Sequence, residues 1–444
     1  MRVLIIWIGP WLDKGEAAML ISMKDALQQQ IPNISITASA SSFSLQDIDM
    51  AKYGEYGFKV LPGIYPSIIS AVPKFKLIKS KTNSKTIKFT LTIPFILIQA
   101  VESIIWLALY RTLRLDLNPL ITSTTDIVSE YKDADYIIFC GGQYITKLGR
   151  DILIALYEII FSKTLNKPVM IWANSLGPFD PKYIHPFVRW ALNKVDLITT
   201  REATSKMHLD RIGVTAPSFV TADAAFILPT VPPEEALLLI KRETEIPENR
   251  IMVGVTVIPW KFLGEDNPNK KFDLYLGAVA SAVDHIVGTF GAHVFFFPQV
   301  IIPNVKDDRP ISFKVLDKIN NKSAVTVLTE DYSPEQIKGM YGCMSLLIGT
   351  RFHSCILAQS MHVPTIAIEY DGHKALGIMR LLELENYVCH INTITSHELI
   401  SKVDEIWKDR DNVKQKLEKN IPVMQAESMK NLSLAVQYLD LKEM

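Results

Sequence analysis

An arginine and a histidine stand two residues apart just after an apolar run, in residues 347–354, which read Leu-Ile-Gly-Thr-Arg-Phe-His-Ser. The apolar run predicts a buried strand, and residues 352–360 predict a helix. Open α/β sheets bind ligands where parallel strands end, and a helix start offers free N–H groups to an anion. Arg351 adds a planar fork that suits carboxylate or phosphate, and His353 adds a proton that moves near neutral pH. The pattern indicates acid–base chemistry on a small anion; the alternative is an ordinary strand-to-helix turn.

Two further cations follow predicted strands. Lys374 follows the strand predicted at 365–368 and lies 21 residues after His353, which is one strand–helix unit. Adjacent parallel strands would bring both loops to one sheet edge, where a lysine can hold a phosphate as a point charge. Arg201 directly follows the strand predicted at 197–200 and would reach the same cleft from the other half of the chain. The alternative for both is a solvated side chain at a helix start.

Predicted strands alternate with helices along the chain, which is typical of parallel sheets in the α/β class. A Pro-rich and polar joint at 229–250 separates two such series. We therefore expect two doubly wound, Rossmann-like domains of residues 1–235 and 236–444 that face a cleft, with a last helix at about 423–440 packed on the first domain. The strands are predicted at 3–8, 135–140, 168–173, 196–200, 218–221, 251–257, 293–297, 324–328, 346–349 and 365–368.

Composition narrows the class of protein. The chain has 444 residues, more than one compact core usually holds, and 47 Lys and Arg balance 47 Asp and Glu. A chain with no net charge lacks the overall positive electrostatic potential that is typical of nucleic-acid-binding proteins. The four cysteines form no Cys-x-x-Cys pair, so we expect no structural metal and a reducing cytosol. The apolar run at 3–8 is followed by Gly9 and Pro10 without a cleavage pattern, which favours a first strand over a secretion signal.

Residues 74–114 depart from the α/β pattern. Six lysines lie between residues 74 and 88, and residues 89–110 are almost wholly apolar. The favoured interpretation is a buried helix or helix hairpin that covers the sheet. A second interpretation is an amphipathic element that contacts the inner face of the cell membrane. A transmembrane helix is the third, but Pro94, Glu102 and the position inside one domain argue against it.

Six short pieces also occur in order over about 360 residues. They are Asp13-Lys14-Gly15-Glu16-Ala17; Asp133-Ala134-Asp135 with Gly141-Gly142; Asn174-Ser175-Leu176-Gly177-Pro178-Phe179; Arg201, Leu209 and Gly213 with Asp223-Ala224-Ala225-Phe226; Gly349 to Ser354; and Tyr370 to Gly377. In this order they resemble the motifs of the polysaccharide pyruvyl transferases. Asp13 and Glu16 replace the Asn and Asp of the family's opening motif, and Gln143 interrupts the glycine cluster. These departures lie in the N-terminal wall of the expected cleft, on the side that would bind the acceptor.

The resemblance implies a fold like that of the GT-B glycosyltransferases. It also implies transfer of a pyruvyl group from phosphoenolpyruvate to two hydroxyls of a sugar, in a cell-surface polysaccharide or its lipid-linked precursor, with release of phosphate. Phosphoenolpyruvate is then a co-substrate, and no cofactor or metal is implied. On this pattern His353 would be the general acid. Phosphoenolpyruvate would contact Arg351, Lys374, Arg201 and Phe352, and the acceptor would lie near Asp13, Gly15, Glu16, Gly142, Asn174 and Asp223, with the base sought among the three carboxylates.

Two other functions fit the same residues. One is a nucleotide-sugar glycosyltransferase of the GT-B type, in which Arg351 and Lys374 would bind a diphosphate. The other is a non-catalytic glycan-binding protein with a degenerate cleft, and the intact Arg351, His353 and Lys374 weigh against it. For the leading function we expect a cytoplasmic enzyme, in contact with the inner face of the cell membrane through residues 74–114.

Overall fold

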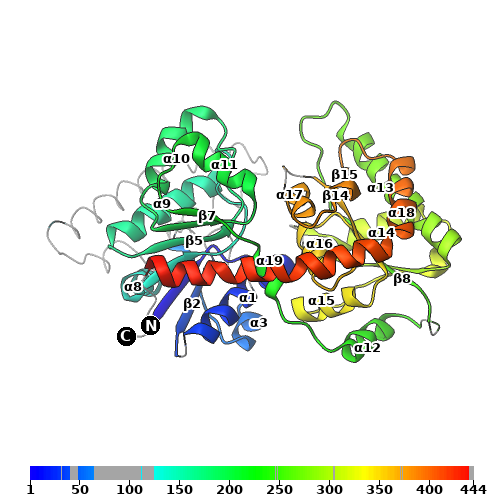
Figure 1. Ribbon diagram of the computed structural model, residues 1–444, viewed down its shortest axis with the longest axis horizontal. Coiled ribbons are helices and arrows are strands. Elements are labelled where there is room, and N and C mark those ends of the chain that lie inside the picture. The colour runs from blue at the N-terminus through cyan, green and yellow to red at the C-terminus, as the bar shows by residue number, and fades with distance from the viewer. Residues whose placement is uncertain are drawn as a thin grey trace, which may run out of the picture.

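The computed structural model describes residues 1–31, 33–40, 49–64, 112, 125–245, 247, 249–303, 306–370, 372 and 374–439. In these residues the chain forms two parallel sheets flanked by helices, side by side in Figure 1. The predicted architecture of two doubly wound α/β domains is therefore confirmed.

The first domain contains a seven-stranded sheet of order β3-β2-β1-β4-β5-β6-β7 among the described residues, with every pair parallel. β5 is buried along its whole length, as expected for a strand covered by helices on both faces. β2 and β3 were not predicted, because small and polar residues interrupt their apolar pattern. The elements are β1 (Arg2–Ile6), α1 (Lys14–Gln30), β2 (Ser35–Ala40), α3 (Met50–Glu55), β3 (Lys59–Pro62), α8 (Thr125–Asp133), β4 (Tyr136–Phe139), α9 (Arg150–Thr164), β5 (Val169–Asn174), η1 (Lys182–Ile184), α10 (His185–Leu192), β6 (Leu197–Thr200), α11 (Ala203–Ile212), β7 (Ser218–Val220) and η2 (Ala224–Ile227).

The second domain contains a six-stranded parallel sheet of order β12-β9-β8-β13-β14-β15, counted over the described residues. β13 and β14 are neighbours, so the loops after them lie at one edge. The elements are α12 (Pro233–Glu243), β8 (Met252–Thr256), α13 (Pro268–Phe290), β9 (His293–Phe296), β10 (Ile301–Ile302), β11 (Lys306–Asp307), α14 (Arg309–Lys318), η3 (Lys322–Ala324), β12 (Val325–Val327), α15 (Pro334–Gly342), β13 (Leu346–Gly349), α16 (Phe352–Gln359), β14 (Thr365–Glu369), α17 (Lys374–Leu381), η4 (Glu385–Tyr387), β15 (Val388–His390), α18 (Ser396–Lys408) and α19 (Arg410–Leu439).

The connection between the sheets runs through α12, which packs on α15. The first sheet ends at Val220 and the second begins at Met252, so the predicted boundary at residue 235 falls inside α12.

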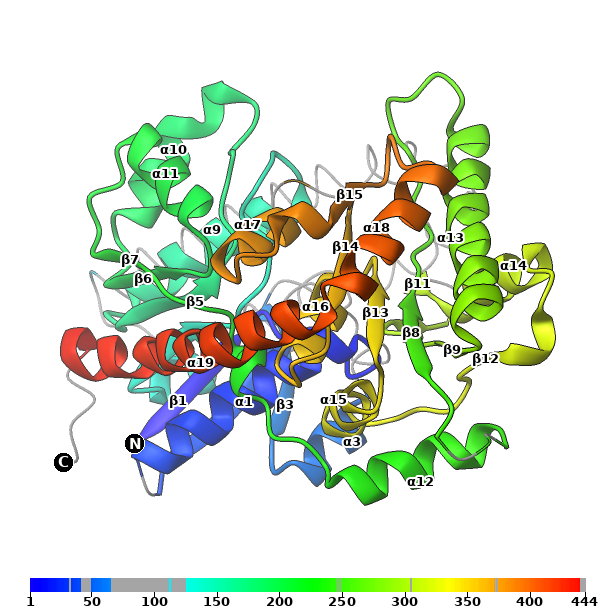
Figure 2. The same cartoon turned by 45° about the vertical axis from the view of Figure 1, so that its right-hand side comes forward.

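The last helix, α19, runs across both domains in Figures 1 and 2. In the second domain, the Asn420 side chain donates to the carbonyl of Leu382 at 3.3 Å. In the first domain, buried Asn431 donates to the carbonyl of Ala222 at 3.1 Å and accepts from the Thr221 hydroxyl at 2.8 Å. α19 therefore fixes the segment after β7, where Asp223 lies.

Predictions about residues 74–114 fall outside the described residues, apart from Thr112, which is helical. No helix within the described ranges is both long enough and apolar enough to cross a membrane.

Candidate active site

A buried charge cluster lies where the carboxyl ends of both sheets meet. Arg201 follows β6, Asp223 follows β7, and His353 stands in the first turn of α16 after β13. Arg201 Nη1 and Asp223 Oδ2 are 2.6 Å apart, and His353 Nε2 lies 3.6 Å from the same oxygen. The guanidinium of Arg201 also lies over the Phe352 ring, 4.7 Å from its centroid. The structure therefore brings together four predicted site residues from two domains.

Asp223 is the anion at the centre of this cluster. Its side chain is 0% exposed and that of Arg201 is 2% exposed. Burial by itself would raise the pKa of Asp223, but Arg201 and His353 together hold this pKa well below its ordinary value. The carboxylate therefore stays ionised, stabilises a positive charge on the His353 imidazole, and cannot easily accept a proton.

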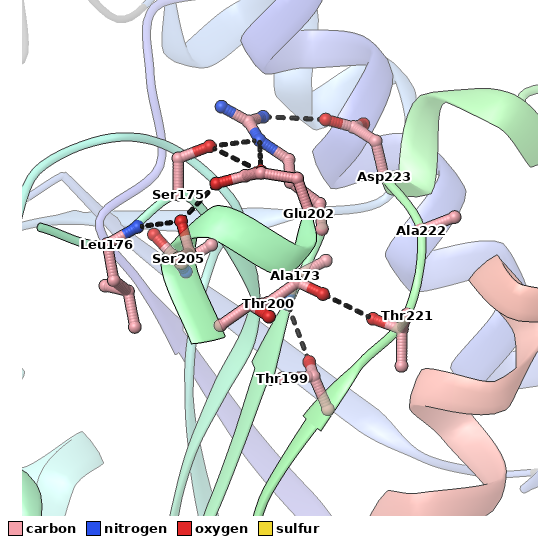
Figure 3. A network of polar contacts seen from close by, with 12 residues as sticks. Ala173, Ser175, Leu176, Thr199, Thr200, Glu202, Ser205, Thr221, Ala222 and Asp223 are labelled. Carbon is pink, nitrogen blue, oxygen red and sulfur yellow. Dashed lines mark hydrogen bonds and ion pairs between the residues drawn. The ribbon is translucent and has the colours of Figure 1, made fainter. Parts of the chain in front are cut away.

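A polar network holds Arg201 in place (Figure 3). Ser175 Oγ accepts from Arg201 Nε at 2.8 Å and donates to Glu202 Oε2 at 3.0 Å. Glu202 also accepts from the Ser205 hydroxyl, which in turn accepts from the backbone N–H of Leu176. With two carboxylates beside it, Arg201 is placed to orient Asp223 and His353; contact with phosphoenolpyruvate stays a prediction.

Arg351 forms a two-pronged ion pair with Asp308, which sequence reasoning missed. Arg351 Nε and Nη2 donate to the two Asp308 oxygens at 3.0 and 2.5 Å. Asp308 is fully buried and also accepts from the backbone N–H groups of Gln299 and Val300. The pKa of Asp308 is raised because burial outweighs the opposing effect of Arg351. Asp308 follows no predicted strand, so no local pattern marks it. The ion pair with Asp308 therefore fixes the orientation of the Arg351 guanidinium plane.

Lys374 opens α17 and lies beside the same turn. Its Nζ is 5.8 Å from the centre of the Phe352 ring and 5.7 Å from that of Tyr370. Phe352, Tyr370 and Lys374 line a small pocket together with Gly349 and Thr350. Arg351, His353 and Lys374 therefore all lie in the turns after the adjacent strands β13 and β14, as the strand–helix spacing predicts, with Phe352 as the residue that Lys374 contacts.

Glu16 and Tyr144 of the first domain form a hydrogen-bonded pair near Arg201. The Tyr144 hydroxyl donates to Glu16 Oε2 at 2.8 Å. Burial and the neighbouring Asp13 raise the pKa of Glu16 to about 8, although the Tyr144 hydrogen bond opposes the shift. Gly142 leaves room for the Tyr144 ring, since a Cβ atom there would overlap it. Tyr144 was not predicted; its position two residues after the glycine pair was the available signal.

The other predicted acceptor residues have structural contacts. Asp13 is the N-cap of α1, and its carboxylate accepts from the Glu16 N–H at 3.4 Å. Asn174 is buried, and its amide donates to the carbonyls of Cys140 and Trp172, both at 3.1 Å. Its side-chain nitrogen therefore joins the ends of β4 and β5.

The start of α1 is tied to the second domain. The Lys14 N–H donates to the carbonyl of Gln299 at 3.0 Å, and the N–H of Ile301 donates to that of Leu12 at 2.9 Å. The Lys14 ammonium is buried and lies 2.5 Å from Asp331. The loop that holds Asp308 thus also holds the start of α1 against α16.

The backbone of α1 at Gly15 lies against the His353 ring of the second domain. A Cβ atom on Gly15 would overlap the His353 imidazole at Nδ1. A glycine here allows the α1 backbone to lie directly against the ring, which explains its place in the predicted site.

We expect Gly15→Ala to lower turnover by roughly 100-fold, because a displacement of about 1 Å in a catalytic group can cost that much. The melting temperature should also fall somewhat, since the overlap with the His353 ring outweighs the higher helix propensity of alanine. The matched control is Gly277→Ala in α13, where an added Cβ meets no atom within 4 Å. Equal turnover for both variants would show that the His353 position does not depend on Gly15.

Comparisons with known proteins agree with this arrangement. The family model described as polysaccharide pyruvyl transferase matches residues 14–372. The amylovoran biosynthesis protein AmsJ of Erwinia amylovora is 23% identical over 302 residues, which cover 66% of this chain and 69% of that protein.

Solved structures share the fold at low sequence identity. The UDP-GlcNAc 2-epimerase from Neisseria meningitidis, bound to UDP-GlcNAc, aligns with a TM-score of 0.57 at 12% identity, over 98% of this chain and 100% of that one. Anabaena Alr3699/HepE in complex with UDP-glucose aligns with a TM-score of 0.55 at 12% identity, over the same shares. These likenesses confirm the predicted GT-B-like fold. With the family match over most of its length, the chain belongs to the polysaccharide pyruvyl transferase family.

Proposed function

We propose that the protein transfers a pyruvyl group from phosphoenolpyruvate to two hydroxyls of a sugar in a surface polysaccharide or its lipid-linked precursor. The observation that carries this proposal is the position of Arg351, His353 and Lys374 in the turns after two adjacent strands. Phosphoenolpyruvate carries a carboxylate and a phosphate, and two cations beside an acid match these needs.

In the proposed reaction, Arg351 and Lys374 bind the anionic groups of phosphoenolpyruvate. His353, as an imidazolium stabilised by Asp223, donates a proton to the methylene carbon, which becomes a methyl group. A sugar hydroxyl then forms a bond to the neighbouring carbon and loses its proton to a base. Cleavage of the carbon–oxygen bond releases phosphate. The second hydroxyl then closes the ketal and gives its proton to the neutral His353 imidazole, which restores the imidazolium. This sequence requires no cofactor or metal.

Glu16 is the proposed base for the sugar hydroxyl. Asp223 is unsuited because its pKa is held low, whereas the pKa of Glu16 is raised to about 8 by burial and Asp13. A general base works best when its pKa lies near the operating pH. Tyr144 fixes the orientation of the Glu16 carboxyl.

The test is incubation of the protein with lipid-linked or soluble glycan acceptors and one of two donors. We expect acceptor-dependent phosphate release from phosphoenolpyruvate and a mass increase of the acceptor that matches a pyruvyl ketal. Nucleoside diphosphate release from a UDP-sugar would instead identify a glycosyltransferase. Glycan binding without product from either donor would support a non-catalytic binding protein.

The cations give a prediction on donor affinity. Lys374→Ala should weaken phosphoenolpyruvate binding by about 10- to 150-fold, the value of one charge-assisted contact, and leave sugar affinity nearly unchanged. Arg351→Lys should also weaken donor binding, because the fork that pairs with Asp308 is lost. Titration calorimetry measures both, with Lys314→Ala on the exposed face of α14 as the control. Unchanged donor affinity in both site variants would remove these residues from the donor site.

A further inference from the structure

Helix α10 and the short helix η1 before it expose three aromatic side chains on the first domain. Tyr183 is 74% exposed, Phe187 is 47% exposed and Trp190 is 49% exposed. Tyr183 lies in η1, which leads directly into α10, and Phe187 and Trp190 lie three residues apart on one side of α10, with ring centroids 5.8 Å apart. Val188 and Leu192 are buried on the opposite side. These three rings, called here the α10 face, are not needed for the core and lie open to solvent.

The α10 face is bordered by positive charge. Lys182, Arg189 and Lys194 are all exposed, while Asp180 is the only carboxylate in residues 180–195. The Lys194 ammonium lies 5.0 Å from the centre of the Trp190 ring. The chain as a whole has equal numbers of acidic and basic residues, so this positive charge is a local feature.

The α10 face is connected to the candidate site. The chain leaves β5 at Asn174, passes Ser175, which bonds to Arg201, and enters α10 after η1. The N–H of Leu148 donates to the carbonyl of Asp180 at 2.6 Å, so the exposed Leu148 lies on a neighbouring loop. Figures 1 and 2 both show α10 at the periphery of the first domain.

We propose that the α10 face docks on an anionic lipid surface, with its rings at the headgroup level and its cations against lipid phosphates. Trp and Tyr favour the membrane interface because one end is apolar and the other polar, and an amphipathic helix with a basic border binds anionic lipids. This proposal rests on the proposed function, since a lipid-linked acceptor would be presented at such a surface.

Size and charge favour a lipid surface over other occupants. The exposed parts of the three rings amount to on the order of 350 Å². A stable protein partner needs about 800 Å² per side, whereas shallow insertion into a lipid interface needs no such area. A neutral sugar would gain nothing from the three cations, while a plane of phosphates would.

The experiment is flotation of the full chain with vesicles of phosphatidylcholine alone or mixed equally with phosphatidylglycerol. We expect binding only to the anionic vesicles, and weaker binding as salt rises. Phe187→Ser with Trp190→Ser should reduce binding at least tenfold. Changing Lys182, Arg189 and Lys194 to Gln should reduce it by about fivefold for each cation. The matched control is Leu238→Ser with Leu263→Ser, two exposed apolar residues of the second domain.

A second readout reports the position of the ring itself. Brominated lipids should quench a part of the tryptophan fluorescence that Trp190→Phe removes. A variant with Lys74, Lys76, Lys79 and Lys81 changed to Gln separates the segment 74–114 from the α10 face. The proposal is overturned if the α10 variants bind vesicles as the wild type does, if the wild type does not bind, or if only oligosaccharides alter Trp190 fluorescence. Loss of a dimer in the α10 variants, seen by sedimentation without any change in vesicle binding, would assign the face to self-association.

Vesicle binding uses neither phosphoenolpyruvate nor turnover. A protein that docks through the α10 face but does not use phosphoenolpyruvate would refute the proposed function alone. A protein that makes the ketal but does not dock through this face would refute the docking alone.

Discussion

His353→Ala is expected to lower turnover by about 10²–10⁴-fold, the usual contribution of a positioned general acid. Phosphoenolpyruvate affinity should remain close to that of the wild type, because the proposed donor cations, Arg351 and Lys374, stay in place. Rapid-quench measurement of phosphate release gives the rate, and titration calorimetry gives the donor affinity.

The matched control for this variant is His397→Ala, an exposed histidine on α18. Free imidazole should restore part of the lost rate, because the alanine leaves a space beside Gly15 and Asp223 that the ring can enter. Turnover near the wild-type value in His353→Ala, with the fold intact by circular dichroism, would exclude His353 as the proton donor.

Glu16→Gln is expected to reduce turnover by a similar factor, about 10²–10⁴-fold, and to change the pH profile. Burial and Asp13 raise the pKa of Glu16 to about 8, so its carboxyl is mostly protonated at neutral pH in the free enzyme. A base must lose this proton first. For the wild type, kcat/KM should therefore follow a bell-shaped pH profile, because His353 must keep its proton while Glu16 loses its own. The rising limb should report Glu16, and in Glu16→Gln this limb should disappear.

Tyr144→Phe provides a directional control for the role of Glu16. The hydroxyl of Tyr144 stabilises the ionised Glu16 and lowers its pKa, so its removal should move the rise in kcat/KM to higher pH. If the rise in kcat/KM stays at the same pH in Tyr144→Phe, or is still present in Glu16→Gln, the base is a group other than Glu16.

Local sequence determined the main elements and the order of the donor-side residues. Strand β13 is buried at every position, and a parallel strand covered on both faces needs a continuous apolar run. The apolar run that ends in Gly349 therefore indicates this strand from the sequence alone. Arg351 and His353 follow this run directly, so their place at the sheet edge depends only on neighbouring residues. Lys374 lies one strand–helix unit further on and reaches the same edge because β13 and β14 are adjacent. β2 could not be predicted this way, since its burial depends on its neighbours rather than on an apolar run.

Tertiary structure decided which charges meet. Asp308 pairs with Arg351 across 43 residues, and Tyr144 bonds to Glu16 across 128 residues. Arg201 and Asp223 follow adjacent strands of the first sheet, and His353 reaches them only because the second domain packs against the first. Each of these residue types is common on protein surfaces, and no local pattern distinguishes a buried ion pair from a solvated charge. Burial and the nearest charges set the pKa values of Asp223 and Glu16 in opposite directions, so the assignment of one as a permanent anion and the other as a base depends on the folded cleft.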